Sequence, residues 1–270
     1  MAVVFEPTEG LTKKPFHYCP GCCHGIIHRI IAETMVEMDI LDSAVGVASV
    51  GCTYNSYEYF NCDMVQAAHG RAPAVATGIK RNLKDQVVFT YQGDGDLASI
   101  GAAEIIHAAA RGENITVFFV NNAVYGMTSG QMAPTTLLGQ VTTTSPFGRD
   151  ASYQGYPINV SELISQLAGS VYVERVCLTD FQNIQKAKKA VRKAFEIQQK
   201  KLGFTMVEFL STCPTNWGKE PVEALEWLKE KMLPQYPLGV YKDVEAATAI
   251  QQTVMSHAAG PVTTPGKEGK

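Results

Sequence analysis

The stretch from residue 86 to residue 122 limits the possible folds more than any other part of the chain. Residues 86–91 (QVVFTY) have the β-branched and aromatic composition of a strand, and residues 115–120 (ITVFFV) repeat it. Between them, a Gly-Asp-Gly turn at residues 93–95 leads into an Ala- and Ile-rich helix over residues 98–111. Because two strands joined by a helix form the basic unit of a parallel sheet, this stretch predicts an α/β fold.

The remainder of the chain continues the same alternation. Helices are predicted over residues 22–38, 72–82, 161–168, 181–200 and 221–232, and strands over residues 44–50, 171–176 and 205–210. This order predicts a mostly parallel sheet with helices on both faces. Residues 122–157 are rich in Gly, Ser, Thr and Pro, which predicts a long functional loop. The expected parts are an N-terminal arm (1–15), one α/β domain (16–240) and a C-terminal helix or flexible tail (241–270).

The polar residues at the two strand ends fit a magnesium-bound diphosphate. Ligands of open α/β sheets bind at the carboxyl ends of the strands, and the N–H groups at a helix start favour phosphate. Asp94 would supply a carboxylate, Asn122 a side-chain carbonyl and Val124 a backbone carbonyl, all oxygen ligands that suit Mg²⁺. Gly95 would let a diphosphate approach the backbone closely. The alternative is a plain turn followed by a strand-end loop, which the spacing of the two pieces disfavours.

The cysteines suggest a second inorganic site. Cys19 and Cys22 lie in a Cys-Pro-Gly-Cys turn ahead of a helix, and Cys52 and Cys213 each follow a predicted strand. These thiols could converge as a Cys₄ site for zinc or for an iron–sulfur cluster, and their spacing does not choose between the two. A redox Cys-x-x-Cys is disfavoured because its usual sequence context is absent. The remaining cysteines are expected to be small buried residues: Cys23, Cys62 and Cys177.

Charge and hydropathy exclude several classes of protein. The formal net charge is −3, no Lys/Arg-rich run stands out, and no apolar stretch is long enough to span a bilayer. The N-terminal sequence lacks the regions of a signal peptide, so we expect a cytoplasmic protein that binds neither nucleic acid nor membrane. Charged residues make up only 18% of the chain, which hints at faces covered by partner subunits.

Taken together, these motifs resemble a known family. The Gly-Asp-Gly turn, helix and Asn-Asn pair are similar to the thiamine-diphosphate motif. Residues 124–131 (VYGMTSGQ) and 134–136 (PTT) resemble the loop of 2-oxoacid:ferredoxin oxidoreductase β subunits, which usually have Gly in place of Ser129. The cysteine pattern is similar to the one that holds the proximal [4Fe–4S] cluster of that family, which implies the ligands Cys19, Cys22, Cys52 and Cys213. The family usually has Gly and then His after the second cysteine, whereas this chain has Cys23 and then His24.

The resemblance implies a thiamine-diphosphate-binding fold and a defined set of cofactor residues. His69 lies in an Ala-His-Gly-Arg segment that by itself predicts a surface loop, but the family has a similar segment in its cofactor pocket. The implied magnesium ligands are Asp94, Asn122 and Val124. The implied cofactor-binding residues are Val50, Gly51, Cys52, Thr53, His69, Gly93, Asp94, Gly95, Asp96, Asn122, Val124, Gly126, Met127 and Thr128.

The function implied by the resemblance is coenzyme A-dependent oxidative decarboxylation of a 2-oxoacid in anaerobic metabolism. Electrons would pass through the [4Fe–4S] cluster to ferredoxin, and coenzyme A would be a co-substrate. No catalytic residue is assigned in this chain, because the activating glutamate of this family comes from a pyrimidine-binding α subunit. A γ subunit and a ferredoxin-like δ subunit or domain are further expected partners. The residues 51–54 and 57–60 look closer to the branched-chain (2-oxoisovalerate) type.

Two other classes of function stay open at this point. A thiamine-dependent decarboxylase or synthase without redox chemistry would keep Asp94 and Asn122 but would not need four thiols at one site. A non-enzymatic scaffold would bind zinc and no thiamine cofactor. Iron and thiamine-diphosphate content separate these alternatives from the oxidoreductase.

Overall fold

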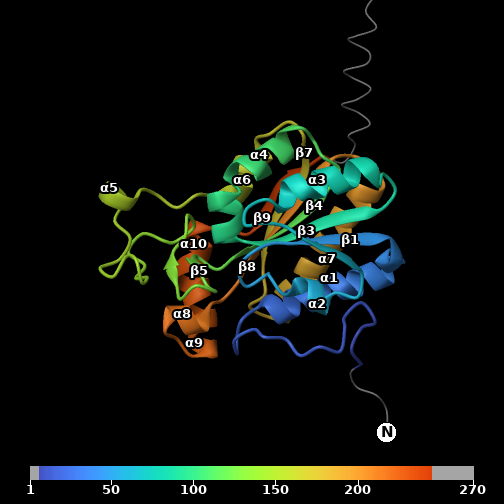
Figure 1. Cartoon of the computed structure of the whole chain (residues 1–270). Helices are drawn as coiled ribbons and strands as arrows, with labels where there is room; N and C mark the ends of the chain where they lie inside the picture. The colour runs from blue at the N-terminus through green and yellow to red at the C-terminus, as the bar shows by residue number, and fades with distance from the viewer. Residues whose placement is uncertain (1–5, 245–270) are drawn as a thin grey trace, which may run out of the picture.

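A seven-stranded sheet with the strand order β2-β1-β3-β4-β8-β7-β9 forms the centre of the computed structural model, which describes residues 6–244. Six strands run parallel, and the edge strand β9 pairs antiparallel with β7 (Figure 1). A two-stranded hairpin, β5-β6, lies apart from the sheet. The strand bounds are β1 Ala44–Ala48, β2 Asp63–Gln66, β3 Val87–Gly93, β4 Thr116–Asn121, β5 Val124–Tyr125, β6 Gln131–Met132, β7 Ser170–Cys177, β8 Phe204–Leu210 and β9 Gly239–Asp243.

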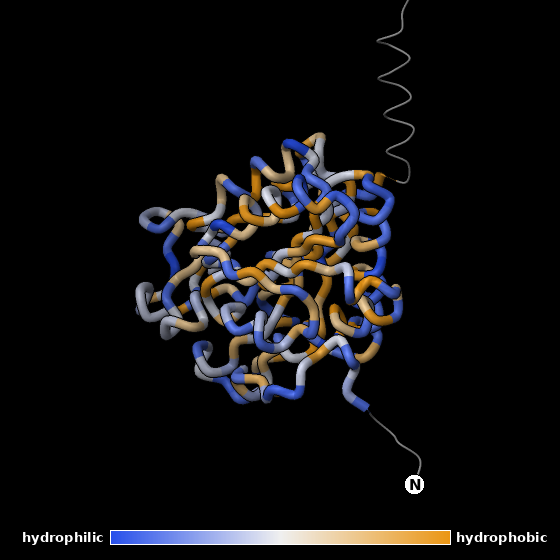
Figure 2. Tube along the Cα trace, turned by 45° about the vertical axis from the view of Figure 1, so that its right-hand side comes forward, coloured by the Kyte–Doolittle hydropathy of each residue, from blue (hydrophilic) through white to orange (hydrophobic). Residues whose placement is uncertain are grey.

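Helices cover both faces of the sheet, as Figure 1 shows. The helices α1 (His24–Glu37) and α7 (Phe181–Gln199) pack on one face, and α3 (Ala72–Asn82), α4 (Ala102–Ala110) and α6 (Val160–Ser165) pack on the other. The central strands are therefore apolar on both sides, which explains why their sequences are continuous hydrophobic runs. In the tube of Figure 2 the orange hydrophobic segments accordingly gather inside the molecule.

Alternate residues of the central strands enter two separate cores. Phe118 of β4 packs with Phe89 and Phe195 beneath α1 and α7, whereas Phe119 packs with the residues under α3, α4 and α6. The helix α1 contributes Ile27 and Ile31, both fully buried and four residues apart on one helix face. This architecture confirms the predicted α/β fold with a mostly parallel sheet and helices on both faces.

The smaller elements follow the long loop or connect the strands. They are η1 (Leu41–Ser43), α2 (Ser56–Tyr59), the π-helical turn η2 (Asp96–Ile100), α5 (Ala151–Gln154), α8 (Pro214–Trp217), α9 (Pro221–Trp227), η3 (Leu228–Met232) and α10 (Leu233–Gln235). The predicted loop over residues 122–157 contains only the short hairpin β5-β6 and α5. Within residues 6–244, no helix is both long enough and apolar enough to cross a membrane.

The sequence patterns missed the two edge strands. The strand β2 is polar and largely exposed, so it lacks the apolar run that identifies a buried strand. The strand β9 crosses the predicted domain boundary at residue 240 and extends the sheet to Asp243, where a helix or tail had been expected. The rest of the predicted tail lies outside the described residues.

Candidate functional site

The carboxyl ends of the parallel strands create one polar edge of the sheet. Because β1, β3, β4 and β8 run in the same direction, the residues that follow them lie at the same edge. Every residue that the resemblance assigned to the cofactor lines one partly open cavity of about 110 Å³ there. Two further residues complete the lining, and the assignment had omitted both: His24 and Tyr125.

Asp94 is the most deeply buried acid of this cavity that lacks a basic partner among the described contacts. Its side chain follows β3 and is 2% exposed. One carboxylate oxygen accepts from the Gly95 N–H at 2.8 Å and the other from the Thr135 hydroxyl at 2.6 Å. Burial raises the pKa of Asp94 from 3.8 to about 6, although these neutral donors work in the opposite direction. A bound cation would relieve this unfavourable burial of charge, so the carboxylate fits a metal ligand.

Asn122 and Val124 follow the neighbouring strand β4. Asn122 is 6% exposed, and its Oδ1 accepts from the Val124 N–H at 3.3 Å, which leaves the oxygen a second lone pair. The indole Nε1 of Trp217 donates to the Asn122 carbonyl at 3.1 Å and fixes the backbone of this turn. The side chain of Asn122 and the carboxylate of Asp94 therefore lie on the same cavity, at the ends of adjacent strands.

The long loop supplies Thr135 to this site because a buried arginine organises it. Arg149 is 6% exposed and donates to the carbonyls of Pro134, Thr136 and Tyr156, at 3.0, 2.5 and 2.8 Å. These bonds bring residues 134–136 and residue 156 of the loop together around one guanidinium. The contact of Thr135 with Asp94 joins residues 41 positions apart, so no local pattern could reveal it.

Asp96, also assigned to the cofactor site, is held by four hydrogen bonds. Its Oδ1 accepts from His69 Nδ1 at 2.5 Å, from Ser49 Oγ at 2.7 Å and from the Gly70 N–H at 2.6 Å. Its Oδ2 accepts from Gln92 Nε2 at 2.5 Å. With both oxygens engaged, Asp96 orients His69 at the cavity, although it also contributes to the cavity lining.

The glycines of the Gly-Asp-Gly turn differ in their surroundings. A methyl group on Gly95 would lie 2.3 Å from the Tyr125 ring, whose hydroxyl donates to the Gly95 carbonyl at 3.1 Å. The sequence suggested that Gly95 leaves room for a diphosphate, but here the Tyr125 ring also requires a glycine. Gly93 has no atom within 4 Å of an added methyl group, so space does not require a glycine there.

This difference predicts opposite outcomes for two matched substitutions. We expect Gly95→Ala to lower the free energy of unfolding by about 1–3 kcal/mol, because the methyl group overlaps the Tyr125 ring. Gly93→Ala should change it by less than about 0.5 kcal/mol in the cofactor-free protein. Chemical denaturation measures both values. Adding Tyr125→Leu should restore the stability of the Gly95→Ala protein, and a failure to do so would refute the clash.

The thiols lie next to this cavity. A methyl group on Gly126 would lie 3.2 Å from Cys52 Sγ, 3.5 Å from Cys213 Sγ and 3.5 Å from Asn122 Nδ2. Two of the predicted cluster ligands and one predicted cation ligand therefore face the same glycine. Cys52 belongs to both groups, because it also lines the cavity.

Cys19 and Cys22 approach from the turn before α1. The turn is closed by the Cys22 N–H, which donates to the Cys19 carbonyl at 3.1 Å. Burial raises the pKa of the Cys22 thiol, and neighbouring Cys23, Cys52 and Cys213 raise it further. Burial likewise raises the pKa of Cys52 to about 12, with contributions from Cys213 and Cys19. Cys19, Cys22 and Cys213 thus each lie near Cys52, where a positively charged metal centre would favour the thiolate forms.

A side-chain amide donates to one of these sulfurs. Cys213 precedes α8 and receives a hydrogen bond from Asn216 Nδ2 at 3.2 Å. The same Nδ2 donates to the Gly126 carbonyl at 2.8 Å, so Asn216 joins the thiol to the cavity loop. Within residues 6–244, no group of three or more His, Cys, Asp or Glu side chains is arranged to hold a single metal ion. Ligands of a four-iron cluster stand farther apart than those of a single ion, so this spacing is compatible with a cluster.

The other cysteines make contacts of a different kind. Cys23 is buried, and its Sγ lies 3.4 Å from Thr212 Oγ1. Cys177 is buried beside Thr179, and Cys62 is half-buried beside Met64. His24 is buried at the start of α1, and its Nδ1 pairs with the Tyr91 hydroxyl at 2.5 Å. It also lines the cavity, and its position two residues after Cys22 was the signal that could have identified it.

Several known proteins are similar to this chain in sequence. The family model "Thiamine pyrophosphate enzyme, C-terminal TPP binding domain" matches residues 44–209. The ketoisovalerate oxidoreductase subunit VorA of Methanothermobacter thermautotrophicus is 52% identical over 245 residues, which is 91% of this chain and 51% of that protein. The chain thus spans about half the length of this curated relative. The 2-oxoglutarate synthase subunit KorB of Methanocaldococcus jannaschii is 34% identical over 82% of this chain and 80% of its own length.

A solved structure shares the fold. The 2-oxoglutarate:ferredoxin oxidoreductase from Magnetococcus marinus, with 2-oxoglutarate, coenzyme A and succinyl-CoA bound, superimposes with a TM-score of 0.71. The match covers 97% of this chain and 93% of that chain at 24% identity, so it supports the fold alone. The chain belongs to the thiamine-pyrophosphate-binding subunits of the 2-oxoacid oxidoreductases, the family that its motifs predicted.

Proposed function

We propose that this chain is the thiamine-diphosphate-binding β subunit of a 2-oxoacid:ferredoxin oxidoreductase. The reaction is the coenzyme A-dependent oxidative decarboxylation of a 2-oxoacid to acyl-CoA and CO₂, with electrons leaving through a [4Fe–4S] cluster to ferredoxin. One observation carries this proposal: Gly126 is approached by Cys52, Cys213 and Asn122 together. Electrons released at the thiamine cofactor can reach an electron acceptor only if the two lie close together. The identity to a ketoisovalerate oxidoreductase subunit favours 2-oxoisovalerate as the substrate.

The oxygen ligands of this chain would hold Mg²⁺ and the diphosphate. Asp94 provides the charged oxygen, and Asn122 and Val124 provide neutral ones. When bound, the thiamine cofactor supplies the carbanion chemistry that removes CO₂ from the 2-oxoacid. His69, oriented by Asp96 through Nδ1, places its ring on the same cavity, where the neutral ring offers Nε2 as an acceptor.

The thiols would hold the cluster beside that cavity. Cys19, Cys22, Cys52 and Cys213 provide four sulfurs, the number that a [4Fe–4S] cluster takes from protein. The Asn216 amide donates to Cys213 Sγ, and such bonds stabilise sulfur that carries negative charge. A zinc scaffold without thiamine would leave the buried Asp94 unexplained.

Partner subunits complete this proposal. The cavity opens beside Met127, which is 51% exposed, and the nearby long loop carries exposed Phe147, Tyr153 and Tyr156. Exposed aromatic side chains of this kind are typical of subunit interfaces. The proposed partners are a pyrimidine-binding α subunit with the activating glutamate, a γ subunit, a ferredoxin-like δ subunit or domain, and external ferredoxin, all in the cytoplasm.

The test is viologen reduction by the anaerobically purified complex. We expect reduction that depends on coenzyme A and is fastest with 2-oxoisovalerate among a panel that includes pyruvate, 2-oxoglutarate and an aryl pyruvate. The same sample should contain iron, sulfide and thiamine diphosphate. Thiamine diphosphate without iron would favour the non-redox decarboxylase or synthase, and zinc without thiamine diphosphate would favour the scaffold.

A further inference from the structure

The turn that carries the proposed cation ligands adopts a backbone conformation that needs support. Ala123, between Asn122 and Val124, has a φ of 60°, in the left-handed region that residues with a side chain seldom adopt. The Asn121 Oδ1 accepts from the Ala123 N–H at 3.2 Å, and Thr136 Oγ1 donates to the Ala123 carbonyl at 2.6 Å. The Asn121 side chain thus helps to hold the backbone of this turn in its left-handed conformation.

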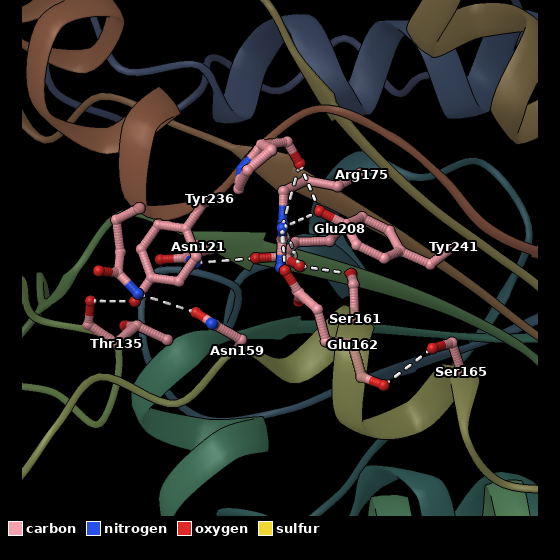
Figure 3. Close-up of polar contacts among 12 residues, drawn as sticks. Asn121, Thr135, Asn159, Ser161, Glu162, Ser165, Arg175, Glu208, Tyr236 and Tyr241 are labelled. Carbon is pink, nitrogen blue, oxygen red and sulfur yellow. Dashed lines mark hydrogen bonds and ion pairs between the residues drawn. The ribbon is translucent and has the colours of Figure 1, made fainter.

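Asn121 is itself held by a buried acid. Its Nδ2 donates to Glu208 Oε1 at 2.8 Å, and Glu208 is fully buried in the neighbouring strand β8 (Figure 3). The other oxygen, Oε2, accepts from Arg175 Nε at 2.8 Å and from Ser161 Oγ at 2.5 Å. The two oxygens therefore face different partners: Oε2 faces the ion pair, and Oε1 faces the turn.

The Glu208 carboxylate is itself fixed by Arg175. Its side chain is fully buried in β7, where it also pairs with Glu162 at 2.6 Å and donates to the Tyr241 hydroxyl at 2.6 Å. The guanidinium carbon lies 4.8 Å from the centre of the Tyr241 ring. Figure 3 shows these side chains converging on Arg175 from β7, β8, β9 and α6. The guanidinium is thus held by several fixed partners and cannot easily move away from Glu208.

A contribution to folding stability does not by itself explain the buried pair of Arg175 and Glu208. Buried ion pairs are often no more stabilising than apolar residues of the same volume, because both charges lose their hydration. The neighbouring positions of β8, Val207 and Phe209, are apolar and fully buried. The chain of hydrogen bonds from Arg175 through Glu208 instead ends at Asn121, the last residue of β4, and the turn after it carries Asn122.

We propose that Glu208, anchored by Arg175, is a positioning residue for the cation site, acting through the Asn121 amide on the turn from Asn121 to Val124. This inference rests on the proposed function. Glu208 lies outside the cavity lining; it fixes Asn121, Asn121 supports the left-handed conformation of Ala123, and the turn in that conformation places Asn122 and Val124 on the cavity. Such outer partners commonly change metal affinity ten- to a hundred-fold.

The test separates the turn from the ion pair. Asn121→Ala removes the link to the turn and leaves Arg175 and Glu208 paired. Glu208→Gln is less suitable, because it leaves the buried Arg175 without a charged partner in β8 and can prevent folding. We expect Asn121→Ala to weaken Mg²⁺-dependent thiamine-diphosphate binding by about ten- to a hundred-fold. Binding is measured on the full complex by calorimetry and by the fluorescence of Trp217, which donates to the Asn122 carbonyl.

Two further variants distinguish positioning from general stability. Ser161→Ala removes a bond to the other Glu208 oxygen, so it should lower the melting temperature and leave binding within about two-fold of the wild type. Adding Ala123→Gly to Asn121→Ala should recover most of the binding, because glycine adopts the left-handed conformation without help. It should not recover the melting temperature, since Glu208 Oε1 still lacks the Asn121 amide.

Each outcome is decisive. Weaker binding in Asn121→Ala that Ala123→Gly recovers supports the inference. A lower melting temperature with unchanged binding in Asn121→Ala overturns it, and so does a Ser161→Ala protein that loses binding equally. If the wild-type complex itself shows no Mg²⁺-dependent thiamine-diphosphate binding, the proposed function fails, and the inference falls with it.

Discussion

Replacing Asp94 with asparagine should abolish the Mg²⁺-dependent binding of thiamine diphosphate and at the same time stabilise the cofactor-free protein. The carboxylate is buried, and burial raises its pKa from 3.8 to about 6. In the cofactor-free state the charged form therefore opposes folding, by about 3 kcal/mol at most. The opposition disappears as the pH falls through 3.8, because the group is then protonated in both folded and unfolded chains, and it reaches its full size as the pH rises above 6. Asparagine has the same shape and no charge.

Thermal denaturation at pH 8, with and without cofactor and Mg²⁺, measures both effects. The wild type should gain about 3 kcal/mol from ligand at a hundred times its dissociation constant, and Asp94→Asn should gain nothing. Asp96→Asn is the matched control, because this second buried aspartate accepts hydrogen bonds from four partners. Its substitution should lower the stability of the cofactor-free protein. An Asp94→Asn protein that still responds to Mg²⁺ and cofactor would refute the assigned cation site.

Replacing Cys22 with serine should remove the iron–sulfur cluster. Cys22 is half-buried among the thiols of Cys52 and Cys213, and a hydroxyl is a poor substitute for a thiolate toward iron. We expect iron to fall from about four atoms per chain to less than about one, with loss of the reduced-cluster EPR signal. Thiamine-diphosphate binding should persist, because Cys22 does not line the cavity.

Cys23→Ala and Cys177→Ala are the controls for this experiment. Both thiols are buried, and neither faces Gly126 in the way that Cys52 and Cys213 do. Their substitution should leave the iron content unchanged, at a cost in stability of about 1 kcal/mol each. If Cys23→Ala loses iron and Cys22→Ser keeps it, the ligand is Cys23, the residue at which this chain departs from the family pattern.

The sequence predicted those parts of the molecule in which local pattern and chemistry coincide. The run from β3 through Asp94 to Asn122 has a strand, a turn, a helix and a strand at readable spacing, and the structure brings its polar residues to one cavity. The central helices and strands begin and end within a few residues of their predicted bounds. Each of these features depends on residues close together in the chain.

The remaining features depend on contacts that sequence spacing does not encode. Thr135 reaches Asp94 only because Arg149 gathers the long loop, and Asn216 reaches Gly126 across 90 positions. Arg175 and Glu208 lie within apolar strand sequences, where each could have been taken for an outward-facing polar residue. The edge strand β2 is polar, so only its pairing with β1 reveals it.

The central claim is that the cation site and the thiols share one edge of the sheet, and a magnetic measurement tests it most directly. Mn²⁺ takes the same oxygen ligands as Mg²⁺ and is paramagnetic. In the anaerobic complex with thiamine diphosphate, we expect Mn²⁺ to broaden the EPR signal of the reduced cluster and to speed its relaxation, and we expect Asp94→Asn to remove the effect. A cluster signal that is identical with Mn²⁺ and with Mg²⁺, in a complex shown to bind both, would contradict the shared edge.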